Sequence, residues 1–384
     1  MNGIGSNPRF SMCMDSAKGL YNGPGDNNCF MNSSVQILWH LDSFRCNFRQ
    51  MSAHACTGSN CVFCSLKEIL TSYQFSDQPI LSSASLRHSL ASTFKSERRF
   101  QLGAPCDASE CYETILDRLH DHVTDSENES NCRAQHCISH QKLSMHINEM
   151  ISCTCGACSK PLQFQQPVYY VSTTALLLAL SCSTPTTSSS SSSSSPPTSS
   201  LSSPPSSSSP SLSSSSSSLK CFGVSRRLQI LTKTPEVTCL GFVWDTHRPS
   251  ADQLRGILKS IDVTIAPREV SCHDYDDENG DDDDAYYNLA GVISYHHGHY
   301  CTFIFHSKQH VWYQFDDGNV QMLDNQWETV VKKCLTNKYQ PLLLFYTKPR
   351  DLCKSVSMVT AFKQTFFRSC DLSTSGWLID LLIG

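Results

Sequence analysis

The sequence contains no long hydrophobic run and no strong excess of charge of either sign. Its most apolar stretches, at 175–180 and 377–383, are far shorter than the ~18 residues of a membrane-spanning helix. The first ten residues, MNGIGSNPRF, lack the basic segment and apolar core of a secretory signal. The formal net charge of −5 over 384 residues disfavours a dominant role in binding nucleic acid. We therefore expect no membrane span, no secretion and no nucleic-acid partner.

Cysteine, in contrast, is abundant, with 21 residues in the chain. Without a secretory signal we expect a reducing, cytoplasmic environment, in which disulfides are rare. The other common uses of cysteine are metal ligation and nucleophilic catalysis. The composition therefore favours metal sites and a reactive thiol over a disulfide framework.

Two segments of biased composition divide the chain. Residues 183–219 are almost entirely Ser, Pro and Thr, and residues 274–284 read DYDDENGDDDD. Neither composition buries enough apolar surface to fold by itself, so we predict a disordered insertion and a solvated acidic loop. Residues 1–17 and 350–384 are predicted to be tails, which leaves one folded domain at 18–349.

The pattern before the Ser-rich insertion is mostly helical, and the pattern after it is rich in β-strands. A helix is predicted at 29–41, with Phe30, Ile37 and Leu38 near one face. Asp107-Ala-Ser-Glu110 resembles a capping box that begins another helix. Short β-prone runs separated by turn residues lie at 228–231, 238–243, 263–266, 289–295, 300–306, 311–315 and 342–346. Helices followed by antiparallel-looking strands predict an α+β fold.

Three blocks of sequence carry residues typical of thiol-dependent hydrolysis. A loop rich in Gly, Asn and Pro leads into the first predicted helix, with Cys29 at the junction. Backbone N–H groups and the helix dipole stabilise a thiolate in such a position. His299 begins a predicted strand, and Asp316 ends the next one. A hairpin of these strands would set Asp316 beside His299, so that Cys29 attacks, His299 carries the proton and Asp316 orients the imidazole.

These blocks resemble the signature elements of the ubiquitin-specific protease family. Residues 22–33 (NGPGDNNCFMNS) resemble its Cys element, 107–112 its D-A-x-E-F segment, and 298–317 its His and Asp boxes. Five further segments resemble one subgroup of that family: FRQ at 48–50, RFQLG at 99–103, HCISHQK at 136–142, STT at 172–174 and YQPLLL at 339–344. The resemblance covers about 18–349, apart from the two biased segments.

The resemblance implies a papain-like cysteine peptidase fold with a thumb at 18–130, fingers at 131–180 and a palm at 220–349. It implies that Cys29 is the nucleophile, His299 the general base and Asp316 the orienting acid, and that the partners are ubiquitin and polyubiquitin conjugates. The subgroup implies selectivity for chains linked through lysine-63 of ubiquitin. That subgroup also carries a historical label of inactivity, so the alternative is a catalytically weak ubiquitin-binding scaffold of the same fold.

The loop before the cysteine departs from the family pattern. The family's oxyanion asparagine lies five residues before the cysteine, and Pro24 takes that position here. The alternatives for this donor are Asn22, Asn27, Asn28 and backbone N–H groups, with Asp317 as an auxiliary acid. Loss of one oxyanion donor lowers kcat by about 10²- to 10³-fold. A reduction of this size is typical of a slow or selective enzyme rather than an inactive one.

Cysteine and histidine occur at metal-ligand spacing in two places. The first set is His54, Cys56, Cys61 and Cys64, and the second is Cys132, Cys137 and His140, with His120 favoured over His136 as the fourth ligand. Closed sites with four N/S ligands are typical of structural zinc. A third, degraded site would use Cys153, Cys155, Cys158 and Cys221. We expect structural zinc and no cofactor for the reaction itself, because the nucleophile is a thiol.

Overall fold

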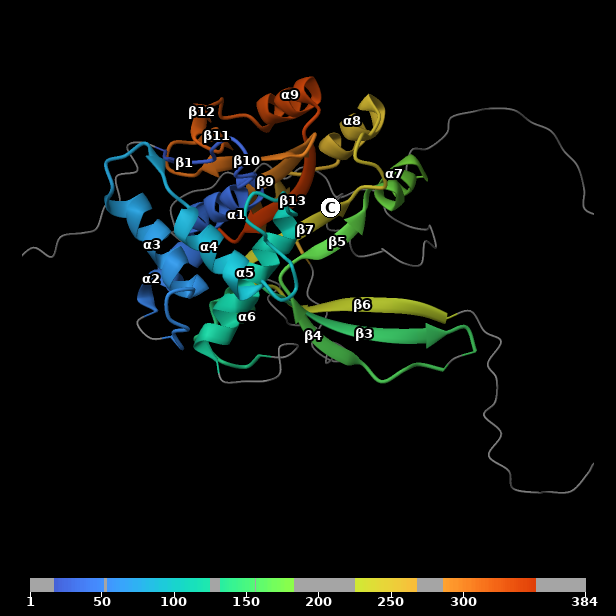
Figure 1. Cartoon of the computed structure of the whole chain (residues 1–384). Coiled ribbons are helices and arrows are strands. Elements are labelled where there is room, and N and C mark those ends of the chain that lie inside the picture. Colours follow the sequence, from blue (N-terminus) through green and yellow to red (C-terminus); the bar gives the residue numbers. More distant parts are fainter. Residues whose placement is uncertain are drawn as a thin grey trace, which may run out of the picture.

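The computed structural model describes residues 17–51, 54–124, 132–155, 157–182, 225–267 and 286–349. The Ser-rich segment, the acidic segment and the two predicted tails apart from Ala17 lie outside these residues. The described chain forms a group of helices, an eight-stranded sheet, and a three-stranded sheet that projects from the body (Figure 1). No helix within the described residues is long and apolar enough to cross a bilayer.

The helical part contains the nucleophile loop and its supporting helices. Helix α1 (Cys29–His40) is buried over all but its last residue, which places it at the centre of the fold. It packs on α5 and on strands of the large sheet. The other helices of this part are α2 (Asp42–Gln50), α3 (Val62–Phe75), α4 (Ala84–Thr93), α5 (Ala108–Val123) and α6 (Ile138–Lys142). A short parallel pair, β1 (Gly19–Leu20) and β2 (Ile80–Leu81), ties the start of the domain to these helices.

Helix α5 begins at the predicted cap, but only half of the capping box is formed. The Asp107 side chain accepts hydrogen bonds from the backbone N–H groups of Ser109 and Glu110. The Glu110 carboxylate does not return to the cap; it lies 2.7 Å from Arg99 Nε. A long-range ion pair has therefore replaced the local hydrogen bond, which is a tertiary effect that the motif alone does not reveal.

The eight-stranded sheet has the order β12-β11-β10-β9-β13-β7-β5, with β8 paired to β9 beside this path. Every pairing is antiparallel except that of β5 with β7. Its strands are β5 (Tyr169–Ser172), β7 (Val237–Val243), β8 (Thr264–Ile265), β9 (Tyr287–His296), β10 (His299–His306), β11 (Val311–Asp316), β12 (Asn319–Met322) and β13 (Gln340–Thr347). Every predicted strand from 238 onward matches one of these.

Helices cover both faces of the large sheet, because its central strands are apolar on both sides. One face packs on α1 and the rest of the helical part through a continuous core. The other face packs on α7 (Thr173–Cys182), α8 (Ala251–Lys259) and α9 (Trp327–Asn337). Helix α8 begins with a full capping box between Ser250 and Gln253, a pattern that is visible in the sequence.

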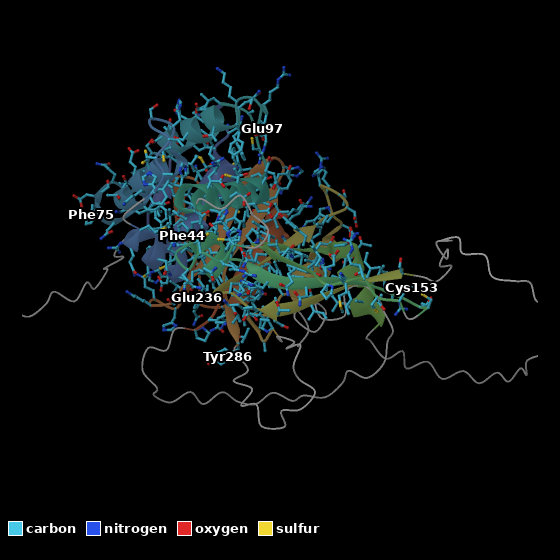
Figure 2. The ribbon with its side chains drawn as sticks, turned by 90° about the horizontal axis from the view of Figure 1, so that it is seen from below. Phe44, Phe75, Glu97, Cys153, Glu236 and Tyr286 are labelled. Carbon is cyan, nitrogen blue, oxygen red and sulfur yellow. The ribbon has the colours of Figure 1, made fainter. Side chains whose placement is uncertain are left out.

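The three-stranded sheet consists of β3 (Met145–Cys153) between β4 (Leu162–Gln166) and β6 (Ser225–Lys233). Figure 2 shows Cys153 near its outer tip, far from Phe44 in the helical part. The strands divide between the sheets differently from the expected ranges. Strand β6, placed in the expected palm, pairs along β3, whereas β5, placed in the expected fingers, joins the large sheet. Strand pattern identifies a strand but not its partner, which explains the difference.

Candidate active site

Cys29 is the first residue of α1, at the end of a loop held by its own side chains. The backbone N–H of Asn28 donates to Asn22 Oδ1 at 2.9 Å, and the N–H of Gly23 donates to Asp26 Oδ2 at 2.9 Å. Asn27 adopts a left-handed conformation with φ 52°, which suits asparagine better than most residues. The thiol is therefore presented at a helix N-terminus, with 6% of the residue exposed.

His299 and Asp316 come from neighbouring antiparallel strands, as the hairpin argument required. His299 begins β10 after a two-residue turn, His297-Gly298, in which both residues have positive φ. Strand β10 pairs with β11 from Thr302 opposite Phe315, so Asp316 lies one position beyond the paired segment. His299 Nε2 lies 2.5 Å from Asp316 Oδ1, close enough for a charge-assisted hydrogen bond.

The electrostatics of His299 depend on both Asp316 and Cys29. Its pKa is raised from 6.5 to about 10, first by the hydrogen bond to Asp316 and next by a hydrogen bond to the Cys29 side chain, with burial opposing both. Because Asp316 occupies Nε2, Nδ1 is the nitrogen that remains for the thiol proton. The structure thus pairs His299 with Asp316 and places Cys29 at the helix N-terminus, where it contributes to the raised pKa of the imidazole.

Asp317, the predicted auxiliary acid, links the strand hairpin to the cysteine loop. Its Oδ2 accepts from Asn22 Nδ2 at 2.7 Å, and its Oδ1 accepts from Asn32 Nδ2 at 2.8 Å. Its Oδ2 lies 4.0 Å from His299 Nε2, beyond hydrogen-bond distance. Burial raises the pKa of this carboxyl group, and the two asparagine hydrogen bonds lower it. Sequence reasoning did not single out Asn32, although the resemblance includes it in the Cys element.

The three asparagines considered as oxyanion donors are placed differently. Asn22 donates its amide N–H to Asp317, and Asn27 donates its own to the carbonyl of Gly103 at 2.7 Å. Asn28 accepts at Oδ1 from Arg87 Nε at 3.0 Å. Two of the three amide donors are therefore engaged within the protein.

Tyr300 and the N-terminus of α5 face each other beside the triad. Tyr300 Oη donates to Asp107 Oδ2 at 3.1 Å, which joins the large sheet to the helical part. Further along α5, burial raises the pKa of Glu113 to about 7, opposed by a hydrogen bond from Tyr170. Neither Asp107 nor Glu113 was among the predicted site residues.

His54, Cys56, Cys61 and Cys64 come together as predicted, with one ligand atom of each within 4.8 Å of the others. Cys64 Sγ lies 3.2 Å from His54 Nε2 and 3.8 Å from Cys56 Sγ. Sequence reasoning missed His122, whose Nε2 lies 3.8 Å from Cys61 Sγ while its Nδ1 donates to the Ala55 carbonyl at 2.6 Å. The donor set fits tetrahedral zinc, since it offers thiolates and a neutral imidazole without acids.

The second set also converges, and all four of its residues are buried: His120, Cys132, Cys137 and His140. Cys137 Sγ lies 3.4 Å from His120 Nδ1 and 3.3 Å from His140 Nδ1. His136 points elsewhere, since its Nε2 donates to the carbonyl of Val123 at 2.7 Å. The structure therefore supports His120 as the fourth residue, and this donor set also fits zinc.

The third predicted site is not assembled within the described residues. Cys155 and Cys158 are exposed, and Cys158 Sγ lies 3.8 Å from the hydroxyl of Ser152. Cys153, Cys155 and Cys158 do not form a cluster of metal-ligand spacing there. Cys221 lies outside the described residues. None of the cysteines whose side chains the structure describes forms a disulfide.

A helical lobe packed on an antiparallel sheet, with Cys, His and Asp between them, is the arrangement of a papain-like peptidase. The profile of the family "Ubiquitin carboxyl-terminal hydrolase" matches residues 19–346. The chain therefore belongs to this family of ubiquitin-specific proteases, and the fold expected from the sequence is confirmed.

Two curated relatives resemble most of this chain. It is 38% identical over 377 residues to mouse (Mus musculus) ubiquitin carboxyl-terminal hydrolase 54, which covers 97% of this chain and 23% of that protein. It is 36% identical over 343 residues to human (Homo sapiens) ubiquitin carboxyl-terminal hydrolase 53, covering 89% of this chain and 31% of the relative. The chain thus spans less than a third of the length of these relatives.

Solved structures resemble the fold at low sequence identity. The SAGA DUB module Ubp8/Sgf11/Sus1/Sgf73 bound to ubiquitin aldehyde gives a TM-score of 0.57 at 17% identity, over 88% of this chain and 71% of that chain. A related Ubp8 module bound to monoubiquitin gives 0.56 at 18%, over 87% and 69%. At this level of identity the likeness establishes the fold.

Proposed function

We propose that this chain is a thiol-dependent deubiquitinase that hydrolyses isopeptide bonds at the C-terminus of ubiquitin. The observation that carries the proposal is the 2.5 Å contact between His299 Nε2 and Asp316 Oδ1, on an imidazole whose pKa the Cys29 side chain also raises. A histidine used only for packing needs no carboxylate on its ring nitrogen. Membership of the family supports the same chemistry.

In the proposed reaction the Cys29 thiolate adds to the carbonyl carbon at the C-terminus of ubiquitin. The carbonyl π electrons move onto oxygen, and the tetrahedral species then collapses with cleavage of the C–N bond. The leaving lysine amine takes the proton from the His299 imidazolium. Water, deprotonated by His299, attacks the thioester and releases ubiquitin and the thiolate. Asp316 holds the ring in position and stabilises its charge through both steps.

The wall beside the triad suits a narrow, extended tail. The Tyr300–Asp107 hydrogen bond sets the distance between sheet and helix next to His299. In this proposal, the space between the sheet and helix α5 beside His299 would admit the Gly-Gly end of ubiquitin. It would exclude residues with bulkier side chains. We extend the proposal to polyubiquitin as substrate, with a preference for linkage through lysine-63 of ubiquitin; the similarity to hydrolases 53 and 54 supports that choice.

The alternative function is a ubiquitin-binding scaffold with little or no catalysis. The specific observation in its favour is Pro24, which occupies the family position of the oxyanion asparagine. The amide groups of Asn22 and Asn27 also favour the scaffold, because both already donate hydrogen bonds within the protein. The intact contacts among Cys29, His299 and Asp316 favour the enzyme.

We also propose that the two four-residue clusters hold structural zinc. One site would use His54, Cys56, Cys61 and Cys64, and the other would use His120, Cys132, Cys137 and His140. Zinc there would supply cross-links that stabilise the helical part and the base of the projecting sheet. Neither cluster contacts the triad, so the zinc would take no part in the reaction.

A ubiquitin probe with an electrophile at its C-terminus tests the enzyme against the scaffold. We expect a covalent adduct with the wild-type chain and none with Cys29→Ala. An adduct that survives Cys29→Ala would overturn the assignment of the nucleophile. Ubiquitin binding without any adduct, by a protein that melts cooperatively, would establish the scaffold instead. Hydrolysis of chains of defined linkage then tests the preference for lysine-63.

A further inference from the structure

We propose that Arg87 is a positioning residue that holds both neighbours of the nucleophile, and that it turns the Asn28 amide so that Nδ2 serves as the oxyanion donor. The inference rests on the proposed isopeptidase reaction and names a donor for its first step. It explains how the loop can function with Pro24 at the usual position of the asparagine. Arg87 lies on α4, far from Cys29 in the sequence.

The contacts of Arg87 fall on the residues on either side of Cys29. Its Nε donates to Asn28 Oδ1 at 3.0 Å, and its guanidinium carbon lies 5.2 Å from the centre of the Phe30 ring. The first contact is a charge-assisted hydrogen bond and the second a cation–π contact. One buried side chain therefore contacts the side chains of the residues immediately before and after the thiol.

The environment of this guanidinium is unusual for a purely structural arginine. Arg87 is 3% exposed, and its other N–H groups donate to the carbonyls of Phe100, Gln101 and Ala104. Among the described residues, no carboxylate lies within ion-pair distance of it. A buried charge without a counter-ion is costly to maintain. In the proposed reaction, negative charge develops on the thiolate and on the carbonyl oxygen. Its attraction to the guanidinium would offset part of this cost.

Chemistry fixes which end of the Asn28 amide faces the arginine. A guanidinium has donors and no acceptor, so Oδ1 must face it and Nδ2 must point away. This NH₂ group has no acceptor among the described residues, and it is not one of the unpaired polar atoms that are sealed from solvent. Asn28 directly precedes Cys29, whose own backbone N–H lies in the unpaired first turn of α1.

In the proposed first step, these two N–H groups stabilise the oxyanion. When the thiolate adds to the carbonyl carbon, the oxygen gains a full negative charge. The N–H of Cys29 and the Nδ2–H of Asn28 then donate to it without transferring a proton. A second donor of this kind is worth about 10²–10³ in kcat. Arg87 adds long-range stabilisation of the same charge, and it touches neither substrate nor reacting atoms.

The substitution Asn28→Asp isolates the donor, because the carboxylate still accepts from Arg87 while the NH₂ group is lost. We expect kcat for isopeptide hydrolysis to fall by about 10²–10³ with little change in KM. Affinity for ubiquitin aldehyde, whose adduct carries the oxyanion, should fall to a similar extent. The rate of alkylation by a haloalkyl-ended ubiquitin, which forms no oxyanion, should stay within a few-fold of wild type.

The role of Arg87 is tested by a double-mutant cycle with Arg87→Met and Asn28→Asp. If Arg87 acts through Asn28, the double variant has the same kcat as the slower single variant, whereas a merely structural arginine gives additive losses. Arg99→Met is the matched control, since Arg99, like Arg87, lies over a phenylalanine ring, but over Phe100 rather than over Phe30 beside the thiol. Unchanged aldehyde affinity in Asn28→Asp would overturn the proposal. Absence of hydrolysis and of alkylation by the wild-type chain would instead refute the proposed function.

Discussion

The amide of Asn22 donates to the carboxylate of Asp317 at 2.7 Å, across 295 residues of chain. The other end of the same amide accepts from the backbone N–H of Asn28. One side chain therefore connects the loop that carries the nucleophile to the hairpin that carries the acid. The relative position of Cys29 and His299 depends on this connection, because the two residues come from different parts of the fold.

We expect Asn22→Ala to lower kcat by about 10- to 100-fold with a smaller change in KM, since a displacement of 1 Å at reacting atoms costs about 10²-fold. Steady-state hydrolysis of a ubiquitin substrate measures this. Asn337→Ala, at the distant end of α9, serves as the control for removal of a surface amide. A wild-type kcat in Asn22→Ala would show that the triad is aligned without this connection.

The raised pKa of His299, about 10, predicts an unusually alkaline limit of activity. The leaving amine needs the imidazolium, so kcat/KM should be maintained above pH 8 and fall as pH rises through about 10. The same shift stabilises the folded protein fully below pH 6.5, and that contribution is lost as pH rises through the folded-state pKa.

Asp316→Ala removes the largest cause of that shift, so the alkaline limb should move to lower pH as kcat falls. A pH–rate profile of both proteins measures the change. Asp324→Ala, an acid that does not contact His299, should leave the limb in place. If the limb stays near pH 10 in Asp316→Ala, another group sets it.

Metal content tests the two clusters separately from activity. We expect two zinc ions per chain by elemental analysis, and one in Cys137→Ser, because Cys137 lies at the centre of the buried set. Loss of a buried cross-link should also lower Tm by at least about 5 °C. Cys158→Ser is the matched control and should keep both ions. A third ion that disappears in Cys158→Ser would show that the projecting sheet binds metal as well.

The pKa of Glu113, raised by burial to about 7, predicts a pH-dependent contribution to folding. The folded protein holds this proton more tightly than the unfolded chain does. The free energy of unfolding should therefore decrease as pH rises from about 4.5 to 7. In Glu113→Gln this part of the slope should vanish, while Glu328→Gln, at the exposed start of α9, should retain it. Urea titrations at several pH values give the slopes, and equal slopes in all three proteins would contradict the assignment.

Local signals identified the elements that carry the site. A Gly/Asn loop before an apolar helical pattern located α1 and Cys29, and β-prone runs located β10 and β11 with His299 and Asp316 at their ends. These signals depend on neighbours in the sequence, such as turn residues, caps and side-chain periodicity. The same reasoning placed the four ligands of the first metal set and three of the second close together in the chain, with His120 on an expected helix favoured as the remaining ligand.

The local sequence pattern did not predict which residues pair when they are far apart in the chain. The roles of Asn22, Asn28 and Asp317 depend on which hydrogen-bond partner reaches each amide or carboxylate, and spacing carries no such information. The sequence favours His120 only slightly over His136 as a ligand, and the structure separates them: His136 donates to the carbonyl of Val123, whereas His120 lies beside Cys137. The sequence did not predict a role for Arg87, because it does not distinguish a buried arginine in a helix from a solvent-exposed one. Only the folded structure shows its burial and its partners.

The order of residues alone therefore predicted the kind of fold, the candidate thiol, imidazole and carboxylate, and most of the two candidate metal-ligand sets. Those features follow from hydrophobic periodicity and from chemical groups that occur at diagnostic spacing. Tertiary structure decided which partner each loop amide finds, which acid joins the hairpin to the cysteine loop, and which strand completes each sheet. Such choices depend on packing between segments far apart in the chain, where burial forces every polar group to find a partner and only the folded geometry determines which partner it finds.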